Sequence, residues 1–138
     1  MIDQKLKEEL SRGLDRGFTK HLKMEFAELS EGHAAIRMPM EEHLTNIYGI
    51  THGGILYTLA DTTSGFAVRT SGSKVVTTNG TMNYLVSGKD TAYLRCEADV
   101  IRQGSTMAVC EAKVYDDKEK LLCCGTFTFY ILKDKAEA

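Results

Sequence analysis

The chain has 138 residues, of which 43% are hydrophobic, and its formal net charge is −2. We expect a single domain over residues 1–138, because a chain of this length can bury one hydrophobic core without disulfides or metal ions. The nearly balanced charge argues against nucleic acid or an anionic membrane as a partner. The lack of a signal-peptide core or an apolar run of ~20 residues predicts a cytoplasmic protein.

The segment before residue 52 is predicted to form one short helix, two strands and a loop. Leu6, Leu10 and Leu14 recur among charged side chains, which is typical of an amphipathic helix, here over residues 4–17. Strand-like runs follow at 21–29 and 32–38, with a hairpin turn between them. A polar loop occupies residues 40–51.

Residues 52–69 are predicted to form the central helix. Positions 52–68 contain no turn signal, and their side chains are apolar or small except for the single charge of Asp61. A helix of this composition should be buried on every side. Other elements of the fold must therefore surround it.

The remainder of the chain is predicted to form four strands, at residues 74–85, 91–102, 105–115 and 120–132, and a frayed tail at 136–138. The connections between these strands are too short for crossovers, so neighbours should be antiparallel. We therefore expect an α+β fold in which an antiparallel sheet of about six strands wraps around one long central helix, with a short N-terminal helix.

The cysteines give no sign of a metal site. Cys96, Cys110, Cys123 and Cys124 lack the spacing of a C-x-x-C or zinc motif, and all four fall in predicted strands. A free cysteine in such a place is usually a small buried hydrophobic group. We expect neither a metal ion nor a cofactor.

Asp61 is the first candidate for chemistry. A carboxylate inside an apolar helix costs several kcal/mol if it is buried without partners, so stability alone does not explain it. Desolvation makes a carboxylate more basic, which suits a general base. The alternative is a structural side chain that reaches solvent or bonds to a backbone amide.

The start of the same helix is the second candidate. Free backbone amides and the helix dipole can bind a developing oxyanion there, and Gly53 and Gly54 allow close approach. Asn46 lies shortly upstream and offers a side-chain amide donor. His52 directly precedes the glycines and is a candidate for shuttling protons or orienting the site. The alternatives are tight packing for the glycines, an ordinary turn for Asn46, and capping or packing at the helix start for His52.

The pattern that joins these candidates resembles the signature of the hotdog-fold thioesterase superfamily, in particular its PaaI-like acyl-CoA thioesterase subgroup. The pattern is Asn46-x-x-Gly49-x-x-His52-Gly53-Gly54, followed by Leu59-Ala60-Asp61. The turn at residues 100–106 is similar to the family's R-x-G-[KRS]-[ST] segment. The resemblance covers residues 20–132.

This resemblance implies a hotdog fold and hydrolysis of acyl-CoA. It implies that Asp61 acts as general base or nucleophile, that the Gly53 N–H and Asn46 hold the thioester carbonyl, and that Thr77 orients water. It also implies a homodimer, or a dimer of dimers, in which two subunits share each site. The helix geometry agrees with a shared site. Gly53 and Asp61 are eight residues apart, or about 12 Å along the helix, which is too far for both to contact one carbonyl group within a single subunit.

Coenzyme A would be part of the substrate and not a cofactor. We expect Gly54 and Tyr57 to contact the substrate. Arg102, Lys89 and Lys133 are the candidates for contacting its phosphates, unless they are merely solvated charges. Two other functions stay open. One is a hotdog enoyl-CoA hydratase or dehydratase, although the prolines common near its histidine are missing here. The other is a non-catalytic acyl-CoA-binding protein.

Overall fold

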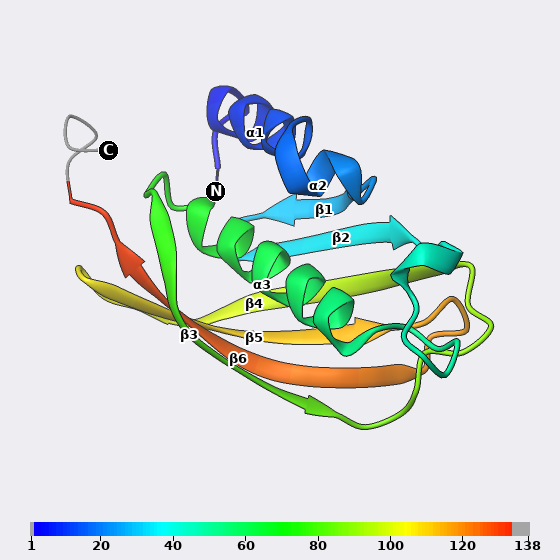
Figure 1. Cartoon of the computed structure of the whole chain (residues 1–138). Coiled ribbons are helices and arrows are strands. Elements are labelled where there is room, and N and C mark those ends of the chain that lie inside the picture. Colours follow the sequence, from blue (N-terminus) through cyan, green and yellow to red (C-terminus); the bar gives the residue numbers. More distant parts are fainter. Residues whose placement is uncertain (1, 134–138) are drawn as a thin grey trace.

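Six strands form one antiparallel sheet in the order β1-β2-β4-β5-β6-β3, and the helix α3 (Gly53–Arg69) lies across its concave face (Figure 1). This computed structural model describes residues 2–133, so the tail expected at 136–138 lies outside the described residues. The predicted sheet and central helix are confirmed. The strands are β1 Glu25–Ser30, β2 His33–Pro39, β3 Val75–Tyr84, β4 Tyr93–Gln103, β5 Met107–Tyr115 and β6 Leu121–Ile131.

The N-terminal segment differs from the prediction of one helix over residues 4–17. It contains α1 (Gln4–Ser11), a 3-10 turn η1 (Arg12–Leu14) and a second helix α2 (Gly17–His21). The predicted helix ended at Gly17, but this residue instead begins α2. Its φ of +63° turns the chain between the two helices, a conformation that glycine tolerates. The first strand consequently begins at Glu25 and not at residue 21.

The loop between β2 and α3 contains one short 3-10 turn, η2 (Glu42–Leu44), and otherwise follows the prediction. None of the helices within residues 2–133 is long and apolar enough to cross a membrane. The core forms between α3 and the concave face of the sheet. Its largest fully buried side chains include Phe127, Phe129 and Leu59.

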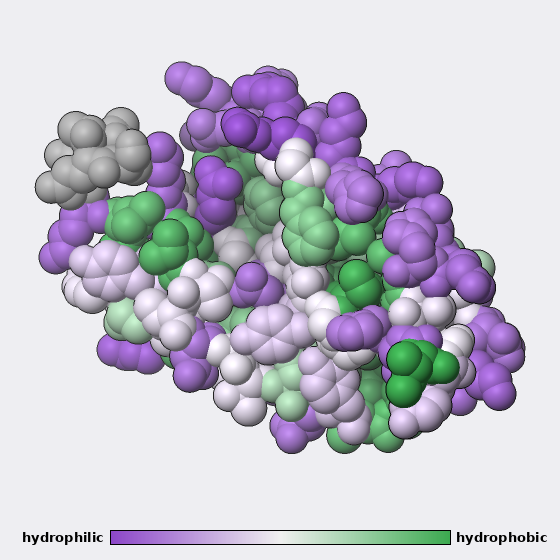
Figure 2. Space-filling view, in the orientation of Figure 1, coloured by the Kyte–Doolittle hydropathy of each residue, from purple (hydrophilic) through white to green (hydrophobic). Residues whose placement is uncertain are grey.

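The expectation that α3 is buried on every side is wrong for the single chain. Leu59, Ala60 and Ala67 are fully buried, but one stripe of the helix, through Gly54, Thr58, Asp61, Thr62, Gly65 and Arg69, keeps contact with solvent. The reason is geometric, because the sheet covers one side of α3 and ends at the edge strand β3. Figure 2 shows weakly polar and apolar residues across the middle of this face, with hydrophilic residues around it.

A β-bulge interrupts the pairing of β3 with β6. The register is regular at Thr77↔Phe129, shifts by one residue, and resumes at Asn79↔Thr128. Thr78 is the extra residue, and its hydroxyl donates to the Thr128 carbonyl at 3.1 Å. A bulge reverses which side chains face the core along the rest of the strand. Gly80 therefore faces α3, directly beneath Tyr57.

Gly80→Ala should expose how tightly α3 and β3 approach each other. A Cβ at this position would overlap the Tyr57 hydroxyl and lie 2.6 Å from the Phe127 ring. We expect the free energy of unfolding to fall by about 1–3 kcal/mol, the usual scale for overpacking. Gly104→Ala is the control, because its nearest neighbouring atom lies 3.5 Å away. Urea unfolding that gave both variants equal stability would contradict this packing.

Candidate functional site

Asp61 projects from the middle of α3 toward β3 and is partly exposed. The Thr77 hydroxyl donates a hydrogen bond to Asp61 Oδ1 at 2.7 Å. A cavity of about 280 Å³, here called the Asp61 cavity, opens beside this pair and has Phe66, Val75 and Phe129 among its walls. The structure therefore places a carboxylate, held on one oxygen, next to an apolar space.

The bulge brings Thr77 and Tyr84 to the same face of β3. Tyr84 pairs with the buried Cys123, and its hydroxyl donates to the Gly53 carbonyl at 3.0 Å. One strand thus contacts α3 both at the carboxylate and at the first turn. This contact was not predictable from the sequence, because the bulge follows from no recognisable motif.

The first turn of α3 is capped by the residue before it. His52 Nδ1 accepts a hydrogen bond from the Gly54 N–H at 2.8 Å, so capping, the alternative considered for His52, is what the structure shows. This bond uses the Nδ1 lone pair, so the neutral ring carries its proton on Nε2. The Gly53 N–H has no acceptor within residues 2–133, and it remains free for a ligand.

Asn46 organises the loop that precedes the helix. Its Oδ1 accepts hydrogen bonds from the Tyr48 N–H at 2.9 Å and the Ile50 N–H at 3.3 Å. The structural role considered for Asn46 is therefore real. The same bonds fix the orientation of the amide, and within the described chain its Nδ2 donor has no partner.

The single chain does not bring all of these groups together. Asp61 lies beside Thr77, and Gly53 lies beside His52 and Tyr84, but the two ends are two helical turns apart, or about 12 Å. No carbonyl oxygen could contact the Gly53 N–H while its carbon lay next to the carboxylate of the same chain. Within one chain, the carboxylate and the free N–H therefore belong to two separate halves.

The residues expected to contact substrate are scattered. Tyr57 packs edge-on against Phe127, with 5.1 Å between ring centroids, and fills the space between α3 and the sheet. Gly54 is exposed at the helix start. Lys89 and Arg102 are both exposed, but they lie near opposite ends of β4, so they cannot bind one phosphate group together.

A different basic cleft lies next to the Asp61 cavity. It has a volume of about 620 Å³ and is lined by Arg69, Lys74 and Lys133, together with hydroxyls of Ser73 and Ser105 and one acid, Glu9. Arg69 also lines the Asp61 cavity, so the two spaces are adjacent. The sequence could have indicated this basic cleft, since Arg69 and Lys74 flank the turn at the end of the central helix.

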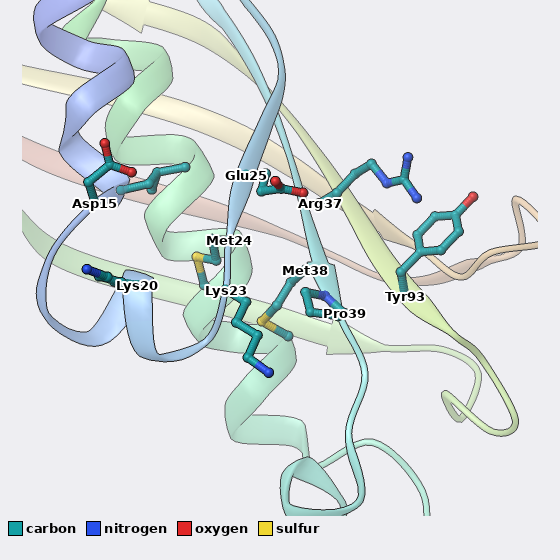
Figure 3. A pocket seen from close by; sticks show the side chains of 10 residues that line it. Asp15, Lys20, Lys23, Met24, Glu25, Arg37, Met38, Pro39 and Tyr93 are labelled. Atoms are coloured by element: carbon teal, nitrogen blue, oxygen red, sulfur yellow. The ribbon is translucent and has the colours of Figure 1, made fainter.

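A third hollow, of about 500 Å³, lies between the N-terminal segment and β2. Figure 3 shows Lys20 and Lys23 apart from Arg37, which extends beside Tyr93. The Arg37 guanidinium stacks 3.9 Å from the Tyr93 ring centroid, and Lys23 pairs with Glu41 at 3.2 Å. This hollow shares no lining residue with the Asp61 cavity, so we do not include it in the candidate site.

The cysteines behave as the sequence predicted. Cys96, Cys110 and Cys123 are buried, and desolvation is the main cause that raises the pKa of each thiol to about 12. A thiol with such a pKa stays protonated near neutral pH and is a poor nucleophile. Cys124 is partly exposed but points away from α3, since its neighbour Cys123 faces the core.

The sequence profile of the thioesterase superfamily matches residues 48–123, from the loop before α3 into β6. The chain belongs to the thioesterase superfamily. It is therefore a thioester hydrolase, and the assignment favours this activity over the hydratase and the non-catalytic binding protein. The fold is the hotdog fold that the resemblance predicted.

Two curated relatives illustrate the match. A protein of Saccharolobus solfataricus that is provisionally named an esterase is 32% identical over 133 residues, which cover 95% of this chain and 94% of the relative. The acyl-coenzyme A thioesterase PaaI of Escherichia coli is 28% identical over 101 residues, which cover 73% of this chain and 72% of PaaI.

Solved structures agree with the fold. A conserved protein of Pseudomonas aeruginosa has a TM-score of 0.80 at 32% identity, covering 86% of this chain and 96% of its own. A thioesterase-family protein of Streptococcus pneumoniae, solved with coenzyme A, has a TM-score of 0.77 at 29% identity, covering 81% and 88%. That protein was also solved with one aspartate or one threonine replaced by alanine, and the two positions are 16 apart, as are Asp61 and Thr77.

His52→Ala should destabilise the fold through loss of the helix cap. We expect the free energy of unfolding to fall by about 0.5–2 kcal/mol, whereas His52→Asn, which keeps a capping side chain, should lose much less. Thermal unfolding of the two variants and the parent protein measures this difference. Equal stability of the alanine and asparagine variants would show that the cap contributes nothing.

Proposed function

We propose that the enzyme hydrolyses acyl-CoA thioesters to the free acid and coenzyme A, with Asp61 as the catalytic carboxylate. The observation that carries this proposal is the 2.7 Å hydrogen bond from Thr77 to Asp61 in the wall of a cavity that is partly apolar. The name of the relative PaaI and the coenzyme A bound to the S. pneumoniae protein support this class of substrate.

The geometry suits a general base. Thr77 occupies Oδ1 of Asp61, which leaves Oδ2 to take a proton from water as the water oxygen attacks the thioester carbonyl carbon. The carbonyl oxygen gains the negative charge and is stabilised by the Gly53 N–H and by Asn46 Nδ2. Collapse breaks the C–S bond, and the proton passes from Asp61 to the departing thiolate. Direct attack by Asp61 on the carbonyl carbon is the alternative that uses the same groups.

The two halves of this site come from different subunits in our proposal. Two antiparallel α3 helices would set Asp61 of one subunit next to Gly53 of the other. The uncovered stripe of α3 has small residues that permit close approach, among them Gly54, Thr58 and Gly65. The edge strand β3 and the loop after it add exposed apolar side chains at Val76, Tyr84, Leu85 and Val86. An open edge next to an apolar surface favours pairing with a second copy.

The basic cleft is the best candidate for the coenzyme A phosphates. Its cations Arg69, Lys74 and Lys133 lie next to the Asp61 cavity, so a thioester at Asp61 could extend its phosphates into them. Arginine and lysine both bind phosphate oxygens through charge-assisted hydrogen bonds. We propose these three residues in place of Arg102 and Lys89.

Asp61→Asn tests the proposed function most simply. Because the change is nearly isosteric, the fold should persist, while kcat should fall by about 10²–10⁴ on loss of the base and KM should change little. Thr77→Val should cost about tenfold, since it removes one hydrogen bond to a charged group. The assay follows free thiol release from short, long and aromatic acyl-CoAs.

Glu111→Gln, on the opposite face of the sheet, is the matched charge control and should keep the parent kcat. An Asp61→Asn variant that folds normally and retains the parent kcat would remove Asp61 from the mechanism.

A further inference from the structure

A second group of titratable side chains lies on the convex face of the sheet, away from α3. Glu28 on β1, His33 on β2 and Glu97 on β4 each offer one ligand atom, and these atoms all lie within 4.8 Å of one another. Ala35 on β2 pairs with both Glu28 and Glu97, and its short, buried side chain lies between them. Three neighbouring strands therefore hold the cluster in place.

The His33 ring is fixed by a carboxylate on each side. Its Nδ1 lies 2.8 Å from Asp99 Oδ1, and its Nε2 lies 2.7 Å from Glu28 Oε1. A neutral ring that donates its Nδ1–H to Asp99 has a lone pair on Nε2, facing an oxygen that also has only lone pairs. Two acceptors at this separation repel each other unless a cation lies with them. That cation is either a proton or a metal ion.

The surrounding charge also favours a cation. Three carboxylates, Glu28, Glu97 and Asp99, surround one imidazole. Arg95 pairs with Glu97, but it also pairs with Glu119 at 2.6 Å, so its charge is divided.

The cluster offers both the direct ligands of a transition-metal site and an outer carboxylate that orients its histidine. Imidazole nitrogen with carboxylate oxygens suits first-row divalent ions such as Zn²⁺ and Mn²⁺. A metal-bound histidine almost always donates its other N–H to an outer carboxylate or carbonyl, which fixes its orientation. Asp99 stands in that outer position here.

We propose that Glu28, His33 and Glu97 bind one divalent transition-metal ion, with Asp99 orienting the imidazole. The ion would bind at Nε2 of His33, the ring nitrogen opposite the one that contacts Asp99. It would join the edge strand β1 to β2 and β4. The site lies across the sheet from Asp61, so its effect is on the stability of this edge and not on turnover.

Isothermal titration of the metal-free protein with Zn²⁺ tests the site, in a Cys124→Ser background that removes the one partly exposed thiol. We expect one ion per chain and a rise in unfolding temperature. His33→Gln and Glu97→Gln should abolish binding or weaken it most, and Asp99→Asn should weaken it by about 10–100-fold. Glu25→Gln removes a carboxylate from the same strand β1 but outside the cluster, and it should bind as the parent does.

Thermal unfolding in EDTA shows independently that each variant is folded. The proposal is overturned if the parent protein binds no Zn²⁺, or if folded His33→Gln and Glu97→Gln bind it as tightly as the Glu25→Gln control. Co²⁺ gives a second readout, because nitrogen and oxygen ligands produce visible ligand-field bands without a thiolate charge-transfer band. A thiolate band, or bands that persist in His33→Gln, would place the ion elsewhere.

Discussion

Side chains alternate between the two faces of a regular strand, and the bulge at Thr78 breaks this alternation in β3. Residues 77 and 84 would otherwise lie on opposite faces. With one extra residue between them, Thr77 reaches Asp61 and Tyr84 reaches Gly53 from the same side of the sheet. Both halves of the candidate site are thus fixed to α3 by a single strand.

The same bulge explains the close packing at the centre of the fold. It turns Gly80 toward α3, where only hydrogen fits beneath the Tyr57 ring and beside Phe127. Tyr57 then fills the space between helix and sheet. An open cavity lies beside Asp61, toward the C-terminal end of α3, and it shares Arg69 with the basic cleft. The bulge therefore determines where α3 and β3 pack closely.

The long, strongly patterned elements were predictable from the sequence. The four strands after α3 lie within two residues of their predicted ends, because turn residues separate them and apolar residues fill them. Asp61 stood out for the opposite reason, as a charge that the pattern of its helix does not explain. The hydrogen bond from Thr77 agrees with the residue pair that the family resemblance indicated.

Other features depend on tertiary contacts that no local pattern encodes. The bulge at Thr78 has no sequence signature, so the hydrogen bond from Tyr84 to the Gly53 carbonyl was not predicted. The sequence predicted that Gly17 ends a helix. It did not show that this residue adopts a positive φ and begins a second helix, α2. The uncovered stripe of α3 was also missed, because a surface of small residues such as Gly54, Thr58 and Gly65 resembles a buried one in the sequence.

The central claim is that Asp61 of one subunit acts with the Gly53 N–H of another. Gly53→Pro removes that N–H alone. Gly53 is the first residue of α3, where proline is favoured, and His52 already has the extended backbone (φ −65°, ψ 133°) that precedes proline. Gly53→Ala is the control, because its Cβ would lie 3.6 Å from Tyr84, an ordinary contact.

The most direct test is to mix two inactive proteins, Asp61→Asn and Gly53→Pro, under conditions in which subunits exchange. A mixed dimer contains one site with both Asp61 and the Gly53 N–H, and random exchange of equal amounts should restore about a quarter of the parent activity. No recovery after demonstrated exchange, with Gly53→Ala fully active, would show that the two groups do not meet across subunits.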